Sequence, residues 1–312
     1  MTVKYKNNSY NDIQQPFLDK GFLDFGQILD QTKCSSVLER IKESRDWSMN
    51  LFRSESEVIK KPQASKVNPG RGISNLAESY DLNFIENNKI IRDSLELIVG
   101  KNYEIILKKF VVGVPDSWVP KWLKPNISKQ LVANLGQYIK EEYRDVSYFR
   151  GIDYHMDLID HPGKIGDYIT LYIYLNDVNE KNSPLHVIEK SHIFGATKFP
   201  HFLNDTSDSY IEYGHTENNL KKFNKKILTG GCGSVYLWSS MTLHGTTPAT
   251  FNDSPRTSLR YTIKKNSSNT ENTLIDSLLK NAGGNLQLNA MRDDVYLNSL
   301  NGKQSRFNKV LK

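Results

Sequence analysis

The chain has 312 residues, 38% of them hydrophobic and 24% charged, which suffices for a buried core beneath an ordinary polar surface. No apolar run approaches the roughly 18 residues of a membrane-spanning helix, and the polar N-terminus lacks the apolar stretch of a secretory signal. Composition therefore argues against a membrane or secreted protein and predicts a soluble, cytoplasmic one, in which Cys34 and Cys232 are buried free thiols. The basic residues behind the net charge of +6 are scattered, so we expect no nucleic-acid partner, although a positive field could steer an acidic small molecule.

Residues 1–102 are predicted to form a mainly helical flank. Apolar residues recur at helical spacing after Thr32, and a second helix is expected over residues 83–99, with Gly100 as its stop signal. Between these helices, residues 60–79 contain prolines and glycines with little periodicity. This segment is expected to be a long loop and a candidate lid over a functional site.

Residues 103–265 have the character of a β domain. Five segments are rich in β-branched and aromatic residues, namely 103–114, 146–154, 168–175, 234–238 and 258–263. Turn-forming Asn, Asp, Gly and Pro separate them, as in a β sandwich rather than in alternating βαβ units. We therefore predict a mainly β fold, a double-stranded β-helix of the jelly-roll, cupin-like type with flanking N-terminal helices.

Two further segments complete the single domain that we predict over residues 1–312. A polar insert at 200–228 is expected to interrupt the strand series without a core of its own, and it is a second candidate lid. The tail, 266–312, is expected to hold one helix around residues 273–280 and a turn at Asn301-Gly302. No internal repeat and no second-domain boundary stand out.

The segment Tyr154-His155-Met156-Asp157 gives the first indication of chemistry. On a strand, side chains two residues apart project from the same face, with Cα atoms roughly 6.6 Å apart, so His155 and Asp157 could bind one cation. An ordinary polar pair would have the same pattern. A third ligand would have to come from a distant strand, and two histidines with one carboxylate leave positions open, as in non-haem Fe(II) oxygenases.

Motifs in a definite order follow this pair. They are Ile169–Val178, Asn182-Ser183-Pro184-Leu185, Glu189-Lys190-Ser191-His192, Gly230–Trp238, Thr242–Pro248 and Pro255–Tyr261. In their order and spacing these elements, over Tyr148 to Ile263, resemble the phytanoyl-CoA dioxygenase family of 2-oxoglutarate-dependent oxygenases. A weaker match around Gly21–Phe25 extends the resemblance. Ser183 and Lys190 depart from it, because glycine is usual at both of these loop positions.

The resemblance implies a metal centre. His155, Asp157 and His244 would hold Fe(II), and 2-oxoglutarate would chelate the iron through its keto and carboxylate oxygens. Related halogenases lack the carboxylate and bind halide in its place, so Asp157 argues against halogenation.

The resemblance also implies a pocket for 2-oxoglutarate. Its far carboxylate would meet Arg256, whose planar fork suits a carboxylate. Arg260 remains the alternative, because it lies four residues further along the same strand and faces the same way; otherwise it would form a surface ion pair. Thr246 could add a hydroxyl hydrogen bond, and Thr170 and Tyr172 share a strand face that could line the same pocket.

The other histidines have less specific readings. His161 is expected to be solvated or near the mouth of the site, and His192 is expected to brace a loop or to touch substrate. Three more are expected to face solvent or neighbouring loops: His186, His201 and His215. Two residues could either border the pocket or be buried for structural reasons: Arg150 and Trp238.

The implied activity is oxidation of an unactivated C–H bond by O₂, with release of succinate and CO₂ and with ascorbate as a possible aid. Hydroxylation, desaturation and oxidative cyclisation all remain open outcomes. The candidate lids are polar and basic, which favours a small, polar, carboxylate-bearing metabolite as the substrate. Two alternatives also remain: a jelly-roll protein that binds a metal or ligand without catalysis, and a Zn²⁺-dependent hydrolase. The oligomeric state is not predicted.

Overall fold

The computed structural model describes residues 10–61, 75–127, 132–161, 163–197, 201–205, 207–246 and 253–287. Its strands are β1 (Phe22–Gln27), β2 (Glu104–Gly113), β3 (Val132–Asn134), β4 (Ser147–Ile152), β5 (Tyr168–Tyr174), β6 (Leu185–Ile188), β7 (Phe202–Asn204), β8 (Tyr210–Gly214), β9 (Lys221–Leu228), β10 (Ser234–Ser239), β11 (His244–Thr246) and β12 (Arg256–Lys264). Its α-helices are α1 (Tyr10–Lys20), α2 (Gln31–Glu43), α3 (Glu55–Lys60), α4 (Asn83–Glu86), α5 (Lys89–Val99), α6 (Lys124–Ile127) and α7 (Leu274–Asn281).

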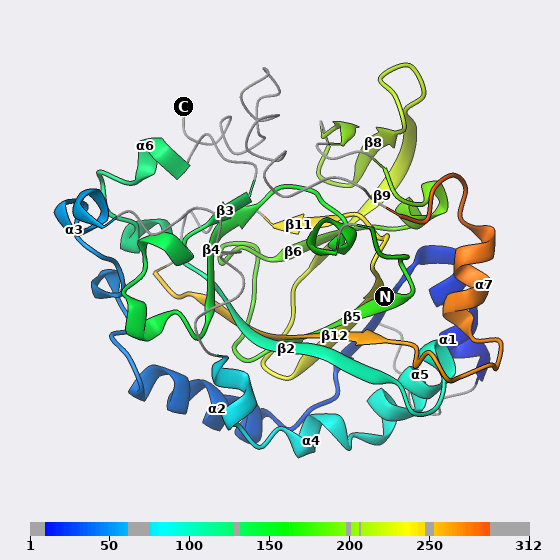
Figure 1. Cartoon of the computed structure of the whole chain (residues 1–312), viewed down its shortest axis with the longest axis horizontal. Helices are drawn as coiled ribbons and strands as arrows, with labels where there is room; N and C mark the ends of the chain where they lie inside the picture. The colour runs from blue at the N-terminus through cyan, green and yellow to red at the C-terminus, as the bar shows by residue number, and fades with distance from the viewer. Residues whose placement is uncertain are drawn as a thin grey trace.

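The strands form two sheets that face each other. The larger sheet has the order β1-β10-β5-β12-β2-β4-β3, and the smaller has the order β11-β6-β9-β8-β7. Figure 1 shows β2 and β12 below β6 and β11, with α2, α4 and α5 along the outer side of the larger sheet. This arrangement confirms the predicted jelly-roll fold, and all five segments predicted as strands contain one.

Strand β5 illustrates why the larger sheet is buried on both faces. Ile169, Leu171 and Ile173 belong to the core cluster that includes the helices. Tyr172 and Tyr174 alternate with them and belong to a second cluster, between the sheets. Because side chains alternate across a strand, a sheet covered on both faces requires a continuous apolar run, which β5 has.

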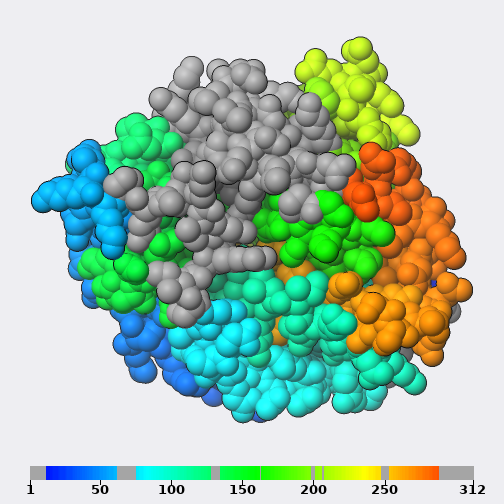
Figure 2. Space-filling view, viewed as in Figure 1, coloured from blue at the N-terminus to red at the C-terminus, as the bar shows by residue number. Residues whose placement is uncertain are grey.

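The helical flank follows the predicted pattern with one interruption. The helix predicted over 83–99 is divided into α4 and α5, because the Asn88 side chain accepts hydrogen bonds from the Ile90 and Ile91 amides and thereby begins a new helix. Gly100 ends α5 at a φ of 88°, as its position predicted. Within the flank, β1 is a strand, which pairs with β10 at the edge of the larger sheet. In Figure 2 the blue and cyan residues of this flank form the lower rim of the molecule.

The segment expected to be a polar insert is instead part of the smaller sheet. Strands β8 and β9 pair with each other, and β9 pairs with β6. Their inward side chains Ile211, Tyr213 and Phe223 are buried in the main core. The prediction of a segment without a core was wrong because lysines occur on both faces of β9 and hide its alternation. The hairpin projects at the upper right of Figure 2.

The candidate lid, the C-terminal tail and the two cysteines were also subjects of predictions. Most of the candidate lid at 60–79 and the turn at Asn301-Gly302 lie outside the described residues, whereas the tail helix is α7. Cys34 and Cys232 are buried and free as predicted. Among the described residues, no helix is both long and apolar enough to cross a membrane.

Candidate metal centre

Backbone pairing brings the two histidines of the predicted triad together. His155 follows β4, and His244 is the first residue of β11. The His155 amide donates to the His244 carbonyl at 2.8 Å, and the His244 amide donates to the His155 carbonyl at 3.0 Å. This isolated antiparallel bridge places the two residues directly opposite each other. The imidazole ring centroids are 4.4 Å apart.

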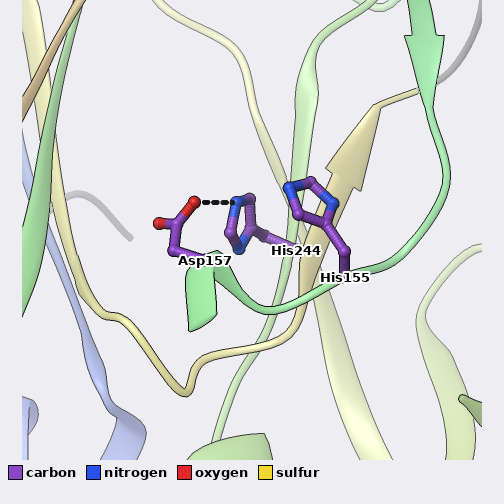
Figure 3. Close-up of side chains that lie close together, drawn as sticks. All are labelled: His155, Asp157 and His244. Atoms are coloured by element: carbon purple, nitrogen blue, oxygen red, sulfur yellow. Dashed lines mark ion pairs between the residues drawn. The ribbon is translucent and has the colours of Figure 1, made fainter. Parts of the chain in front are cut away.

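Asp157 reaches the same point from a turn rather than from a strand. It begins the short 3-10 helix Asp157–Asp160, so the prediction that the His-x-Asp pair lies on one strand was wrong. The side chains nevertheless converge: one ligand atom from each of His155, Asp157 and His244 lies within 4.8 Å of the other two. Figure 3 shows the carboxylate beside His244, with His244 Nε2 at 3.6 Å from Asp157 Oδ1.

Both imidazoles are held in the same tautomer. His155 Nδ1 lies 2.9 Å from the Asp153 carbonyl oxygen, and His244 Nδ1 lies 2.9 Å from the Thr242 carbonyl oxygen. A carbonyl oxygen only accepts hydrogen bonds, so each Nδ1 donates the hydrogen and each Nε2 keeps a lone pair. Such outer hydrogen bonds orient metal-binding histidines.

The two oxygens of Asp157 have different partners. Oδ2 accepts hydrogen bonds from Thr170 Oγ1 at 2.6 Å and from Trp238 Nε1 at 3.0 Å. Oδ1 faces His244 and accepts a hydrogen bond from Arg260 Nη2 at 2.6 Å. Thr170 and Trp238, which both belong to the larger sheet, therefore fix the plane of the Asp157 carboxylate. Asp157 is 1% exposed.

The surroundings set the charge of these ligands. Burial, together with the neighbouring His244, lowers the pKa of His155 to about 3, so its ring is neutral near pH 7. Burial alone would raise the pKa of Asp157, but the charge of Arg260 and the contact with His244 outweigh it and hold that pKa well below its ordinary value. A neutral imidazole and an ionised carboxylate are the forms that bind metal ions.

The triad lies in the wall of a cavity between the two sheets. The cavity encloses about 620 Å³ of space between atoms, its open mouth included. The larger sheet contributes Tyr172, Trp238 and Arg256 to the wall, and β11 contributes Thr246. The cavity therefore brings the predicted metal ligands and three of the four residues predicted to bind 2-oxoglutarate to one place.

Arg256 is a buried cation in this cavity. It is 1% exposed, and its Nη1 donates a short hydrogen bond to the Ser183 carbonyl oxygen. Its Nε has no hydrogen-bond partner, and no carboxylate among the described residues forms an ion pair with it. Gly113 stands opposite Arg256 on β2, with the guanidinium packed beside it.

Arg260, unlike Arg256, lies beside carboxylates. It is not in a surface ion pair, because its side chain is 11% exposed and lies inside the cavity wall. Besides Asp157, it has Asp160 Oδ2 at 3.7 Å from its Nη1. Its charge is therefore balanced by the protein itself.

The other predicted pocket residues differ in position. The Thr246 hydroxyl accepts a hydrogen bond from the Ile152 amide at 3.0 Å, which ties β4 to β11 at the cavity. Tyr172 lines the cavity with its ring centroid 5.5 Å from that of Trp238. Thr170 is fully buried and contacts Asp157, so it orients the candidate metal ligand and does not line the cavity.

The histidines outside the triad and Arg150 have structural partners or surface positions. His192 Nε2 lies 3.2 Å from the Leu18 carbonyl oxygen, which confirms the expected brace between a loop and α1. Arg150 pairs with Asp116 at 2.9 Å, away from the cavity wall. Three histidines were expected to face solvent or neighbouring loops. His215 is exposed, whereas His186 and His201 are buried and contact Tyr154 and Thr197 of neighbouring loops. His161 packs edge-on against Tyr168 at the turn after Asp160.

Ser183 and Lys190, which depart from the family pattern, both have left-handed backbones. Their φ angles are 56° and 68°. Glycine adopts this region without steric cost, which explains why glycine is usual at these positions. The loop at Ser183 directs its backbone carbonyl at Arg256.

The chain matches no protein-family model and no curated protein. Its fold is similar to crystal structures of the non-heme alpha ketoglutarate dependent epimerase SnoN from nogalamycin biosynthesis. One is 11% identical with a TM-score of 0.51, and the match covers 82% of this chain and 82% of that chain. The other, SnoN in complex with Fe3+, alpha ketoglutarate and nogalamycin RO, is 13% identical with a TM-score of 0.50 and coverages of 82% and 83%. The jelly-roll fold of this chain is thus one that a non-haem, alpha-ketoglutarate-dependent enzyme uses.

Proposed function

We propose that this protein is an Fe(II)- and 2-oxoglutarate-dependent oxygenase similar to the phytanoyl-CoA dioxygenase family. His155, Asp157 and His244 would hold the iron, and Arg256 would bind the far carboxylate of 2-oxoglutarate. The substrate would be a small, polar, carboxylate-bearing metabolite. An unactivated C–H bond would be oxidised by hydroxylation, desaturation or cyclisation, with release of succinate and CO₂.

The donor set fits a ferrous ion. Two imidazoles with their Nε2 lone pairs available and one ionised carboxylate match the facial arrangement that non-haem Fe(II) oxygenases use. Among the described residues no further His, Cys, Asp or Glu joins the cluster, so the protein leaves positions for other ligands. When bound, iron and 2-oxoglutarate would together supply the activation of O₂.

The uncompensated charge of Arg256 is the single observation that carries the assignment of the cosubstrate. A buried charge is costly unless it is paired, so a guanidinium that is 1% exposed and lacks a carboxylate partner among the described residues requires an anionic ligand. Its planar fork can accept a carboxylate in a bidentate pair. Arg260 is the weaker candidate because Asp157 and Asp160 already balance its charge.

The other residues would position the reactants. Thr170 and Trp238 fix the Asp157 carboxylate from behind, so that Oδ1 faces the metal position. Tyr172 and Thr246 line the same cavity as the triad and Arg256, where they would exclude water and orient 2-oxoglutarate. A preorganised site of this kind contributes mainly through positioning.

The test is anaerobic addition of Fe(II) and 2-oxoglutarate to the metal-free protein. We expect a weak visible charge-transfer band and, after O₂ is admitted with ascorbate, production of succinate. A zinc hydrolase would give neither the band nor succinate, and a binding protein without catalysis would give the band alone. His161→Ala should keep both signals, because His161 contacts Tyr168 and is not in the triad.

A further inference from the structure

The two cysteines come together in the fold from distant parts of the chain. Cys34 belongs to α2, where Gln31 and Ser35 lie on the same side of the helix. The Cys232 sulfur is 3.6 Å from Ser35 Oγ and 3.8 Å from the Gln31 carbonyl oxygen. Cys34 and Cys232 also belong to the same core cluster. The two thiols therefore face each other between α2 and the loop that precedes β10.

Backbone hydrogen bonds hold the loop of Cys232 against the N-terminal flank. Gln27 Nε2 donates to the Cys232 carbonyl oxygen at 2.7 Å, and the Leu29 amide donates to the Gly233 carbonyl oxygen at 3.3 Å. From the other side, Asp177 Oδ1 accepts a hydrogen bond from the Cys232 amide at 2.8 Å. These contacts fix Cys232 beside α2, so the two sulfurs need no large movement to react.

The two thiols differ in reactivity. The Cys34 thiol, assisted by the Ser35 hydroxyl, lowers the pKa of Cys232 to about 7, although burial and the charge of Asp177 oppose this shift. The contact with Cys232, burial and the charge of Asp30 raise the pKa of Cys34, which therefore stays protonated. Cys232 is also the more accessible sulfur, because it is 7% exposed and Cys34 is fully buried. Since the thiolate is the nucleophilic form, a small oxidant reacts first with Cys232.

We propose that Cys34 and Cys232 form an oxidation site, which a peroxide converts into an intramolecular disulfide. The Cys232 thiolate attacks one peroxide oxygen, the O–O bond breaks, and hydroxide leaves, so that Cys232 becomes a sulfenic acid. The Cys34 sulfur then attacks the Cys232 sulfur, and the departing hydroxide takes the Cys34 proton as water. Two thiols and one peroxide thus give one disulfide and two water molecules, and the peroxide accepts the two electrons that the thiols lose.

The oxidation site is separate from the candidate metal centre. Neither cysteine lines the cavity that contains the triad. The disulfide links α2 to the loop before β10, the strand that carries Trp238. Its formation requires neither iron nor 2-oxoglutarate, so this inference stands or falls independently of the proposed function.

The experiment treats the full-length, metal-free protein with hydrogen peroxide, removes the peroxide with catalase, and alkylates the remaining thiols after denaturation. Intact mass and non-reducing electrophoresis identify the product. We expect wild type to lose the mass of two hydrogen atoms, to remain a single chain, and to regain both thiols after reduction. In Cys34→Ala, dimedone should instead trap a sulfenic acid at Cys232, because no second thiol is available.

Ser35→Ala tests the role of the Cys232 thiolate without removing a sulfur. Loss of the hydroxyl should raise the pKa of Cys232, so disulfide formation at pH 7 should be at least about twofold slower than in wild type. Its rate should also rise with pH at a higher pH than in wild type. Ser36→Ala makes the same change on a different side of α2 and should leave the rate unchanged.

Three results would overturn the proposal. The first is a wild-type protein in which both thiols can still be alkylated after peroxide treatment. The second is a product that has gained oxygen without losing hydrogen, or a disulfide between two chains. The third is an equal rate in wild type and Ser35→Ala, which would refute the route through the Cys232 thiolate. The wild-type results decide the matter even if a variant fails to fold.

Discussion

Arg256 and Arg260 lie on the same face of β12, yet their side chains have different surroundings. Arg260 pairs with Asp157 and approaches Asp160. Arg256 has a backbone carbonyl as its hydrogen-bond partner and no carboxylate among the described residues. One arginine is therefore a structural counter-charge for a candidate metal ligand, and the other is left for a ligand from outside. Periodicity places both in the pocket, and only their partners distinguish their roles.

The largest effect is expected from Asp157→Ala. This change removes a candidate metal ligand and leaves Arg260 buried without its closest partner. We expect loss of bound iron and of succinate production, together with a decrease of about 3–5 kcal/mol in the free energy of unfolding of the metal-free protein. Metal analysis and denaturant unfolding measure the two effects. A variant that still bound stoichiometric iron would contradict the ligand assignment.

Replacing each arginine in turn by methionine tests whether Arg256 and Arg260 have different roles. Arg260→Met should destabilise the metal-free protein by about 3 kcal/mol, because Asp157 becomes an unpaired buried charge. Arg256→Met removes a buried charge that no carboxylate of the described residues balances, so the free energy of unfolding of the metal-free protein should stay the same or increase. The order should reverse in 2-oxoglutarate binding, where Arg256→Met should weaken affinity by about 100-fold. Equal destabilisation by both changes would argue against the distinction.

The pH dependence of stability should follow Arg260 and not Arg256. The pKa of Asp157 is held below its ordinary value in the folded protein, so the unfolded state binds the proton more readily. The stabilisation is thus fully present above about pH 4, the unfolded value for aspartate, and is lost as the pH falls through the lower folded pKa. Urea unfolding of the metal-free protein should show the difference between wild type and Arg260→Met shrinking below about pH 4. The corresponding difference for Arg256→Met should stay constant.

The smallest effect is expected at the loop that contacts Arg256. Ser183 has a φ of 56°, so Ser183→Gly should relieve backbone strain and stabilise the protein by about 0.5–1 kcal/mol. The affinity for 2-oxoglutarate should stay within about twofold, because the backbone carbonyl that contacts Arg256 is retained. Thermal unfolding checks the first expectation. A destabilised variant would show that the hydroxyl contributes more than the strain costs.

Much of the fold could be predicted from the sequence because the pattern of apolar residues along a segment indicates which of its faces are buried. Strand β5 is apolar throughout because helices cover one face and the smaller sheet covers the other. Strand β9 has lysines on both of its faces, so its alternation was masked and the segment was mistaken for an insert.

For the candidate site, the sequence shows which residue types are present and in what order. His155 and Asp157 are two residues apart, His244 follows later, and Arg256 lies twelve residues beyond His244. Only the tertiary structure decided that these side chains meet. The bridge between His155 and His244 joins segments far apart in the chain, whereas the turn that presents Asp157 is closed by local backbone hydrogen bonds. It also decided which arginine is balanced, because the energy of a buried charge depends on its neighbours in space and not on its neighbours in sequence.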